Sequence, residues 1–350
     1  MFYERSISNY MQDLIDLILS KENVKQAIRA VYSNKGAPGI DGMTVRELED
    51  YFRRYGELIR AQIKAKKYQP QPVKRVYIPK PNSDKMRPLG IPTVVDRVVQ
   101  QAVARVLVGI YEPKFSEFSY GYRPDRSCHT AVKQALEYLN EGRTVVVDFD
   151  IEKFFDTVNH DKLISILRET INDSTTLHLI RQFLKAGVME DGLVSPSDEG
   201  VPQGGPLSCV LSNIYLDKLD KELERRNLAF TRYADDFCIY VRSEKAAERV
   251  MASVSSWIER KLFLKVSPTK TKIVPPSQSE YLGFGYWKTA GGWKCRPLES
   301  RKTRLKNKIR EVTCRRKAAS LPIAITITKL NQIVRGWINL WCRQHERIHE

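Results

Sequence analysis

Two adjacent aspartates inside a strongly β-prone stretch constrain this chain more than any other feature of its sequence. In residues 228–241, LAFTRYADDFCIYV, aromatic and β-branched residues flank Asp235 and Asp236 on both sides. This pattern predicts a β-hairpin with the two acids at its tip. Adjacent carboxylates repel each other and lose hydration when they are buried. Such a tip therefore either holds a cation or is a solvated turn.

A second acidic stretch favours the cation. In residues 144–151, TVVVDFDI, the alternation predicts a strand with Val145, Val147, Phe149 and Ile151 on one face and Asp148 and Asp150 on the other. Pairing of these acids with Lys153 or an arginine is the simpler alternative. We expect instead that the strand end lies beside the hairpin and brings Asp150 together with Asp235 and Asp236. Three such carboxylates form the ligand set that two Mg²⁺ ions need for phosphoryl transfer.

The charge of the 350-residue chain indicates a polyanionic partner. Its 58 Lys and Arg exceed its 41 Asp and Glu, for a net charge of +17, which favours nucleic acid over a membrane surface. Residues 286–350 hold seven Lys and nine Arg against four Glu and so carry +12 of this charge. Apolar residues recur there at helical spacing, which predicts a small helical domain with one apolar and one basic face.

Other features limit the class of protein. No apolar run approaches the ~20 residues that span a bilayer, and the first residues lack the order of a signal peptide, so we expect a cytoplasmic, bacterial-type protein without a membrane partner. The six cysteines include no Cys-x-x-Cys pair, and of the five histidines only His345 and His349 stand close together in sequence. We therefore expect neither structural zinc nor a disulfide framework.

The remaining stretches predict helices around 11–31, 44–66, 93–110, 130–139 and 210–224, and a strand over 72–79. Thr44 and Glu47 form a candidate capping box. A basic turn over 80–87 is either a solvated loop or a place to hold a triphosphate. The loop over 118–127 mixes aromatic residues with arginine, as in sites that stack bases, and a Gly-rich loop over 199–208 precedes a helix.

Several of these stretches together resemble one family. Residues 233–236, YADD, resemble the palm motif of reverse transcriptases, and residues 147–160 and 200–208 resemble the bacterial group II intron-encoded subgroup, in the same order along the chain. Residues 36–42, 78–92, 119–124, 281–285 and 336–339 are similar to further motifs of that family. The resemblance implies an α+β right-hand polymerase fold. Fingers and an antiparallel palm would occupy 1–285, with an N-terminal extension over about 1–70, and a basic helical thumb or maturase domain would occupy 286–350.

The resemblance also implies roles for individual residues. Asp150, Asp235 and Asp236 would be the catalytic metal ligands, whereas Asp148 would be structural. Phe154 would form the wall beneath the incoming sugar; in the alternative, Phe154 is a core residue and Phe155 lines the pocket. The other nucleotide contacts would come from Lys80, Arg87 and Gln203, and Lys270 or Lys272 would protonate pyrophosphate. The expected nucleic-acid contacts are Arg123, Arg126, Tyr281, Gly283, Arg301, Arg304 and Lys308.

We therefore expect an RNA-directed DNA polymerase that uses an RNA template, a DNA or RNA primer, deoxynucleoside triphosphates and two Mg²⁺ ions, with Mn²⁺ as a substitute, and that binds its intron RNA. One alternative is a maturase, an RNA-binding splicing factor in which polymerisation is secondary. Another is a retron or diversity-generating reverse transcriptase. The three intact acids favour the polymerase and residues 36–42 favour the intron group. The chain ends soon after residue 337, where family members commonly continue, and shows no His-Asn-His pattern, so we expect no target cleavage.

Overall fold

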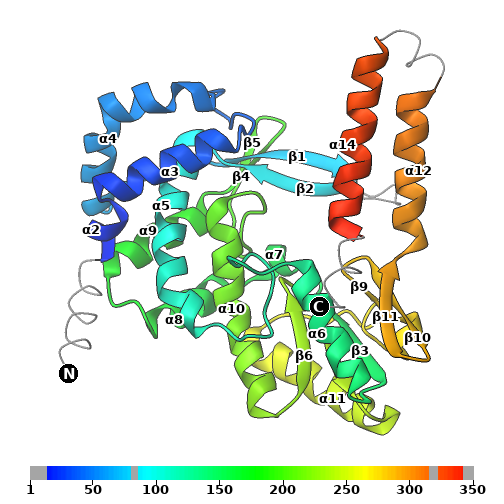
Figure 1. Ribbon diagram of the computed structural model, residues 1–350. Helices are drawn as coiled ribbons and strands as arrows, with labels where there is room; N and C mark the ends of the chain where they lie inside the picture. Colours follow the sequence, from blue (N-terminus) through cyan, green and yellow to red (C-terminus); the bar gives the residue numbers. More distant parts are fainter. Residues whose placement is uncertain (1–13, 80–85, 315–321, 342–350) are drawn as a thin grey trace.

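The computed structural model describes residues 14–79, 86–314 and 322–341 and shows an α+β chain with a helical C-terminal segment, as predicted (Figure 1). Its helices are α2 (Leu14–Ile18), α3 (Lys21–Ser33), α4 (Leu48–Lys64), α5 (Val94–Tyr111), α6 (Cys128–Asn140), α7 (Phe154–Thr157), α8 (His160–Arg168), α9 (Ser174–Lys185), α10 (Pro206–Arg225), α11 (Glu244–Trp257), α12 (Glu299–Thr313) and α14 (Ile323–Trp341). Its strands are β1 (Val73–Pro79), β2 (Met86–Ile91), β3 (Val145–Asp150), β4 (Val188–Glu190), β5 (Leu193–Ser195), β6 (Ala229–Tyr233), β7 (Asp236–Val241), β8 (Lys272–Val274), β9 (Glu280–Tyr281), β10 (Phe284–Thr289) and β11 (Gly292–Pro297).

An antiparallel sheet in the order β6-β7-β3-β8 forms the centre of the molecule. The predicted alternation of β3 is confirmed, because Val147 and Phe149 are buried in the large core with α10 and α11 residues. Val146 faces the opposite side and joins a second core with α6 and with β10. Phe149 and Phe237 stack across the β3–β7 pair, with ring centroids 4.7 Å apart. A hydrophobic core therefore packs against each face of β3 over most of its length. Asp150 lies at the end of the strand, beyond these two cores.

A second sheet, in the order β2-β1-β4-β5, is built on the predicted basic hairpin. Helix α5 follows it directly, and the Thr93 hydroxyl caps that helix by accepting a hydrogen bond from the Asp96 N–H. At the start of α4, the Thr44 N–H and hydroxyl both donate to Glu47 Oε2, which confirms the role of this pair at the helix start. Helices α2 to α5 pack against this end of the molecule (Figure 1).

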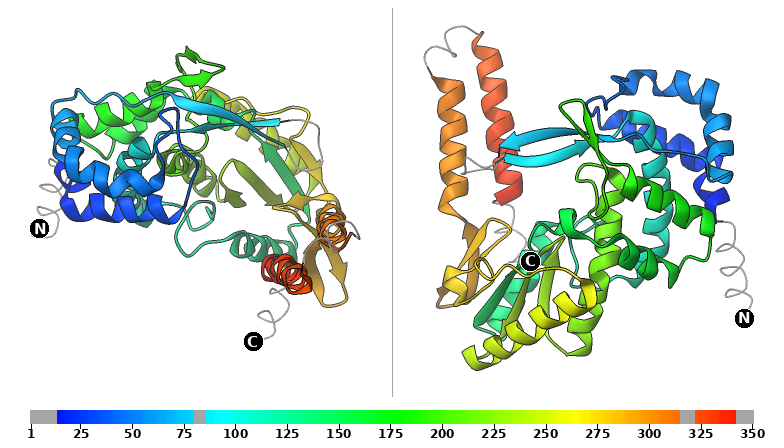
Figure 2. Two further views of the ribbon diagram at one scale, coloured as in Figure 1. Left: turned by 90° about the horizontal axis from the view of Figure 1, so that it is seen from above. Right: turned by 180° about the vertical axis from the view of Figure 1, so that it is seen from behind.

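A small sheet, in the order β11-β10-β9, connects the central sheet to α12 and α14. The sequence placed a domain boundary at residue 285, but β10 runs through that position and the helical segment starts at Glu299. Helices α12 and α14 stand side by side (Figures 1 and 2), and in the view from above the β1–β2 hairpin lies apart from them (Figure 2). No helix within the described ranges is long and apolar enough to cross a membrane.

Candidate active site

The two predicted acidic strands meet at one edge of the central sheet. Asp150, the last residue of β3, lies directly opposite Asp236, the first residue of β7. The hairpin differs in detail from the prediction, because Tyr233 pairs with Asp236 and the two-residue turn is therefore Ala234–Asp235. Ala234 adopts a φ of 58°, the left-handed region in which side chains other than glycine are strained. Only one of the two adjacent acids is thus in the turn, and the other begins the strand.

The acids at this edge act on each other electrostatically. Desolvation and the charge of Asp150 raise the pKa of the Asp235 carboxyl, while the guanidinium groups of Arg87 and Arg232 oppose that rise. Desolvation and then the charges of Asp235, Asp148 and Asp150 raise the pKa of Asp236 to about 7, although this residue is exposed along the edge. Carboxyls that raise one another's pKa form a negative cluster, and such a cluster fits a cation.

Two lysines that the sequence left as alternatives are separated by the structure. Lys270 Nζ lies 3.0 and 3.1 Å from the two carboxylate oxygens of Asp150. Lys272 Nζ lies 4.0 Å from Asp148 Oδ2, and Asp148 also accepts hydrogen bonds from the Ser279 hydroxyl and the Cys238 thiol. Asp148 thus has partners of its own in the sheet, and Lys270 is the lysine at the acid edge.

The three carboxylates do not form a closed ligand set. Within the part of the chain that the structure describes, no group of three or more His, Cys, Asp or Glu side chains converges as metal ligands. Asp150, Asp235 and Asp236 thus share one edge of the sheet without closing around a single point, and their role as metal ligands stays a prediction. The ammonium group of Lys270 pairs with Asp150. A metal ion would have to displace Lys270 from Asp150.

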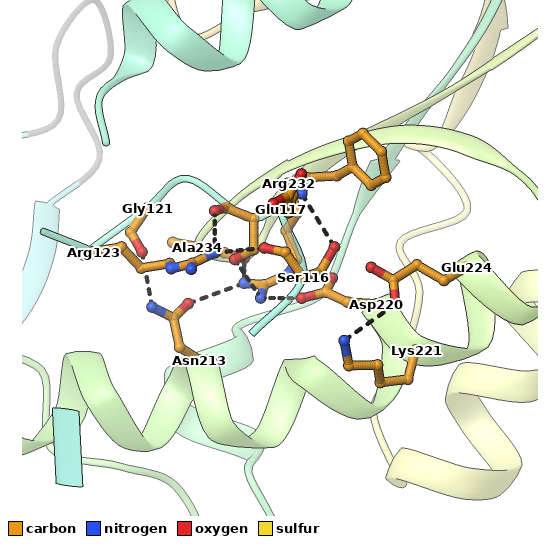
Figure 3. Close-up of polar contacts among 12 residues, drawn as sticks. Ser116, Glu117, Gly121, Arg123, Asn213, Asp220, Lys221, Glu224, Arg232 and Ala234 are labelled. Carbon is orange, nitrogen blue, oxygen red and sulfur yellow. Dashed lines mark hydrogen bonds and ion pairs between the residues drawn. The ribbon is translucent and has the colours of Figure 1, made fainter. Parts of the chain in front are cut away.

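A fully buried arginine, which the sequence analysis did not single out, fixes the turn that carries Asp235 (Figure 3). Arg232 forms a two-pronged ion pair with Asp220, with Nε–Oδ1 2.7 Å and Nη2–Oδ2 2.5 Å. The remaining N–H groups donate to Ser119 Oγ (2.7 Å), Asn213 Oδ1 (3.1 Å) and the carbonyl oxygen of Ala234 (2.9 Å). All five guanidinium donors are satisfied, so the buried charge is compensated. The arginine holds the strained residue next to Asp235 by its carbonyl group.

The loop before α6 closes around the same turn. Asn213 Nδ2 donates to the carbonyl oxygen of Gly121 at 2.8 Å. A side chain at Gly121 would place its Cβ 2.4 Å from the Ala234 nitrogen, so this position accepts only glycine without a backbone shift. Three segments far apart in the sequence therefore converge on Ala234. The sequence does contain one indication of this network. Arg232 stands within a stretch that predicts a buried strand, and a buried arginine requires a buried partner for its charge.

The neighbouring phenylalanines of α7 occupy different environments, which favour the alternative in which Phe154 is a core residue and Phe155 lines the pocket. Phe154 is 1% exposed and packs against Tyr215 in the large core, with ring centroids 6.4 Å apart. Phe155 is partly exposed and lines a cavity of about 820 Å³ together with residues of β1, β2 and β4 and of the Gly-rich loop. The physical reason is the helical turn at residue 154, which sends successive side chains about 100° apart. Phe155 is therefore the residue in contact with the cavity.

The same cavity receives the Gly-rich loop of the sequence analysis. Gln203 lines it, and its carbonyl oxygen accepts a 2.7 Å hydrogen bond from the Gly90 N–H of β2. Gly204 has a φ of 130°, and a Cβ there would lie 2.3 Å from the Gly90 oxygen, so the Gly-rich loop and β2 touch backbone to backbone. Arg87 is exposed on β2 and its charge acts on Asp235. Lys80 lies outside the described residues.

Several predicted nucleic-acid contacts are buried instead. Arg123 is 8% exposed, donates to both Glu112 carboxylate oxygens and to three backbone carbonyls, and lies over the Phe115 ring, so it is a structural residue. Arg126 is half-buried, donates to the Glu117 carbonyl and lies over the Tyr120 ring. Tyr281 is fully buried and packs in the second core. The side chains of Arg123 and Tyr281 therefore offer no surface to a strand, because an alternating aromatic and basic pattern also describes a packed loop.

The predicted basic residues of the C-terminal segment lie on α12. Arg301, Arg304 and Lys308 line a cavity of about 470 Å³ between α12 and α14, together with Trp337 and Trp341. Arg301 lies over the Trp341 ring, 5.7 Å from its centroid, whereas Arg304 and Lys308 are exposed. Gly283 has a φ of 86°, and a Cβ there would lie 2.8 Å from both Arg301 Nε and the Trp341 ring, so glycine is required where the small sheet meets these helices. The structure thus gives Gly283 a packing role.

Comparisons with known proteins show which families and proteins this chain is similar to. Residues 78–286 match the family described as reverse transcriptase (RNA-dependent DNA polymerase), and residues 302–346 match the group II intron, maturase-specific domain. Protein YkfC of Escherichia coli (strain K12) is 35% identical over 75% of this chain and 79% of its own length. Group II intron-encoded protein LtrA of Lactococcus lactis subsp. cremoris is 39% identical over 65% of this chain and 38% of its own length. A solved structure, a partial Cas6-RT-Cas1–Cas2 complex, covers 71% of this chain and 43% of its own at 27% identity, with a TM-score of 0.45.

Proposed function

Because the chain belongs to the reverse transcriptase (RNA-dependent DNA polymerase) family, in its group II intron form, we propose that it extends a primer on an RNA template at the edge formed by β3 and the β6–β7 turn. Membership in this family confirms the right-hand polymerase fold class predicted from the sequence. The observation that carries the proposal is the placement of Asp150, Asp235 and Asp236 at one edge of the central sheet, where desolvation and then neighbouring charges raise the pKa of Asp235 and Asp236. We propose that its substrates are an RNA template, a primer and deoxynucleoside triphosphates.

The carboxylates at this edge fit a divalent cation. We propose that the cation is Mg²⁺, that two ions bind per site, and that Mn²⁺ can replace them. Bound there, the ions would lower the pKa of the primer hydroxyl and stabilise the charge on the leaving pyrophosphate. Asp150, Asp235 and Asp236 would hold them. Arg232 would keep Asp235 in position through the Ala234 carbonyl. Lys270, released from Asp150, would give a proton from Nζ to the pyrophosphate oxygen that the reaction exposes.

The cavity at Phe155 is the proposed nucleotide pocket. Phe155 would lie beneath the sugar of the incoming nucleotide, and Gln203 would pack nearby. Arg87, whose charge reaches Asp235, would hold the triphosphate together with Lys80. Lys272 is assigned to Asp148 and takes no part in this pocket. The β1–β2 hairpin would thus form one wall of the nucleotide pocket, and α7 and the Gly-rich loop would form the other.

The C-terminal segment is proposed to grip the template–primer duplex and the intron RNA. Arg304 and Lys308 are exposed on α12, and residues 286–350 carry most of the net positive charge. We propose fingers and palm over residues 1–285 with the connecting β10–β11 hairpin, an N-terminal extension over about 1–70, and the helical thumb from α12 onward. The match of residues 302–346 to a maturase-specific domain favours a second function, in which the protein binds its intron RNA and assists splicing.

Asp235→Asn tests the proposed function. The variant removes one metal ligand and keeps the size of the side chain, so primer extension on an RNA template with Mg²⁺ should fall at least a hundredfold, the scale expected when transition-state charge stabilisation is removed. RNA binding should stay nearly unchanged, because it depends on phosphate contacts elsewhere. Lys245→Gln, on the exposed face of α11, is the control. Extension by Asp235→Asn at the wild-type rate would contradict the assignment.

A further inference from the structure

His160, the first residue of α8, is a buried histidine with no role in the mechanism proposed above. Its imidazole Nε2 lies 2.6 Å from the carbonyl oxygen of Gly200. Because a carbonyl oxygen only accepts hydrogen bonds, Nε2 carries the proton. The other ring nitrogen, Nδ1, is buried and has no hydrogen-bond partner among the residues that the structure describes. The side chain therefore makes one directed polar contact, and that contact is with the Gly-rich loop over 199–208.

The imidazole of His160 is neutral at neutral pH. Burial lowers its pKa, and the cations of Lys185 and Arg181 lower it further, while the Gly200 carbonyl group and the Asp161 carboxylate oppose them. Protonation would add an N–H group at Nδ1, in a buried position that offers it no acceptor. The part that the side chain plays here is thus that of a neutral hydrogen-bond donor, and its charge is not needed.

The contact fixes one peptide unit from both ends. The carbonyl oxygen of Gly200 and the N–H group of Val201 belong to the same planar peptide. His160 binds the carbonyl end, and the Val201 N–H donates to the Phe155 carbonyl oxygen at 2.6 Å. The Gly200 N–H donates to the Val158 carbonyl oxygen at 2.8 Å. Rotation of this peptide would break the backbone contact to Phe155, so the imidazole holds Phe155 through one intervening peptide.

The Gly-rich loop lies directly on the backbone of α7 at this point. Gly200 has a φ of 89°, and a Cβ there would lie 2.9 Å from the carbonyl oxygens of Phe155 and Asp156. No side chain fits between the two segments, so their hydrogen bonds set the spacing. Three residues further along, Gln203 is bound to β2 through its carbonyl oxygen. The peptide held by His160 therefore joins two residues that line the same cavity, Phe155 and Gln203.

We propose that His160 is a positioning residue for the nucleotide pocket. Its Nε2–H group holds the Gly200–Val201 peptide and thereby sets the position of the Phe155 ring relative to Gln203. His160 is not among the residues that line the cavity, so it acts on the nucleotide only through these two neighbours. This inference rests on the proposed function, because it takes the cavity at Phe155 as the nucleotide pocket. Selection of the sugar then depends on a histidine outside the pocket.

The test compares His160→Gln with His160→Met in the full chain. Both side chains are unbranched and similar in length, but only glutamine has an N–H group in the position of Nε2. For His160→Met, the KM for deoxynucleoside triphosphate should rise about tenfold while kcat stays within about twofold, the pattern of a lost binding contact. The ratio of ribonucleotide to deoxyribonucleotide incorporation should rise about fivefold, because the Phe155 ring is misplaced. His160→Gln should keep the wild-type value of both.

Two further variants separate positioning from stability. The buried Thr176 hydroxyl on α9 donates to Asp173 Oδ2 at 2.7 Å, so Thr176→Val also loses one buried hydrogen bond, away from the cavity. Its melting temperature should fall, but its KM and its sugar ratio should stay at the wild-type values. His160→Asn carries an amide too short to reach the Gly200 carbonyl and should repeat the result of His160→Met. It provides the measurement if His160→Met does not fold.

A double-mutant cycle tests the route through Phe155. In a Phe155→Ala background, His160→Met should no longer change the sugar ratio, because the ring that it displaces is gone. This inference alone is overturned if Phe155→Ala changes the ratio and His160→Met does not, if His160→Gln is as defective as His160→Met, or if Thr176→Val shows the same defect. A wild type that extends no primer, or a sugar ratio that Phe155→Ala leaves unchanged, would overturn the proposed nucleotide pocket and this inference with it.

Discussion

Phe154 and Phe155 are adjacent in the chain, yet only Phe155 reaches the proposed nucleotide pocket. If its ring occupies the volume that a 2′-hydroxyl group needs, a ribonucleotide must displace it at a cost of about 1–3 kcal/mol, the scale of overpacking. Phe155→Ala should therefore raise ribonucleotide incorporation relative to deoxyribonucleotide incorporation by about ten- to a hundredfold. The measurement is the ratio of single-nucleotide incorporation rates for the two sugars.

Phe154→Ala is the matched control for this prediction. Truncation of a buried Phe costs about 3–5 kcal/mol of stability, so the melting temperature should fall while the sugar ratio of the folded fraction stays at the wild-type value. A ratio that changed for Phe154→Ala and not for Phe155→Ala would reverse the assignment of the two rings.

Ala234, the strained residue of the β6–β7 turn, allows a test in which the melting temperature and the primer-extension rate are expected to change independently. Ala234 has a φ of 58° and is held by Arg232 through its carbonyl oxygen. Ala234→Gly should leave the melting temperature equal or raise it, because the left-handed conformation costs a non-glycine residue about 1–2 kcal/mol. The primer-extension rate should nevertheless fall about tenfold, because a more flexible turn places Asp235 less accurately.

Asn227→Gly controls for this effect, since Asn227 also has a positive φ, of 54°, in the turn before β6. It should alter stability by a similar amount and leave the extension rate at the wild-type value. If Ala234→Gly extended primers as fast as the wild type, the geometry of this turn would not limit catalysis.

The position of a residue could be predicted from the sequence where it depends only on its neighbours along the chain. The alternation of β3 placed Asp148 and Asp150 on one face because a strand has a period of two. The roles of Arg123 and Arg232 depended on partners that no local pattern identifies: Glu112 for one, and Asp220 and Ser119 for the other. The sequence could not decide which of Phe154 and Phe155 lines the pocket. Neighbouring residues of a short helix point about 100° apart, and tertiary packing determines which of the two rings is buried.

At the scale of elements, long segments with a strong period were predicted and short ones were not. Helix α10 begins at Pro206 rather than near Val210, because proline at the first helical turn starts the helix. Strands β4, β5 and β9 have two or three residues each and leave no detectable alternation. The β10–β11 hairpin was absorbed into the predicted helical domain because the charge of residues 286–350 was considered as one block.

Helix α12 is the element whose role in binding is most directly testable. Its Arg304 and Lys308 are exposed, four residues apart, and so lie on one face. Arg304→Ala/Lys308→Ala should weaken binding of a template–primer duplex and reduce the slope of log affinity against log salt by roughly 0.9 for each phosphate that the helix no longer neutralises. Lys245→Ala/Arg249→Ala on α11 should change neither. An unchanged slope in the α12 variant would mean that this face does not touch the duplex.

At the scale of the whole molecule, the repulsion between the acids at the edge of the central sheet makes the stability of the fold depend on pH and on bound metal ions. Asp235 and Asp236 have raised pKa values in the folded state, with that of Asp236 at about 7 against an ordinary value of 3.8. A carboxyl whose pKa is raised on folding contributes stability that is fully present below pH ~4 and is lost as the pH rises through the folded-state pKa. Without divalent cations, the contribution of this edge to stability should therefore fall between about pH 4 and pH 7.

Mg²⁺ should reverse that loss, because a cation bound only by the folded protein stabilises it by about 2.7 kcal/mol at a hundredfold excess over its dissociation constant. We expect the rise in melting temperature on adding Mg²⁺ to be larger at pH 8 than at pH 5, because protonated carboxyls bind no metal. Asp235→Asn should melt higher than the wild type in the absence of metal, since one repelling charge is gone, and should respond less to Mg²⁺. Lys270→Met should melt lower without metal, because Asp150 loses its counter-charge, and should respond more strongly. Equal responses to Mg²⁺ in all three proteins would mean that the cation binds elsewhere and that the acid edge is not the metal site.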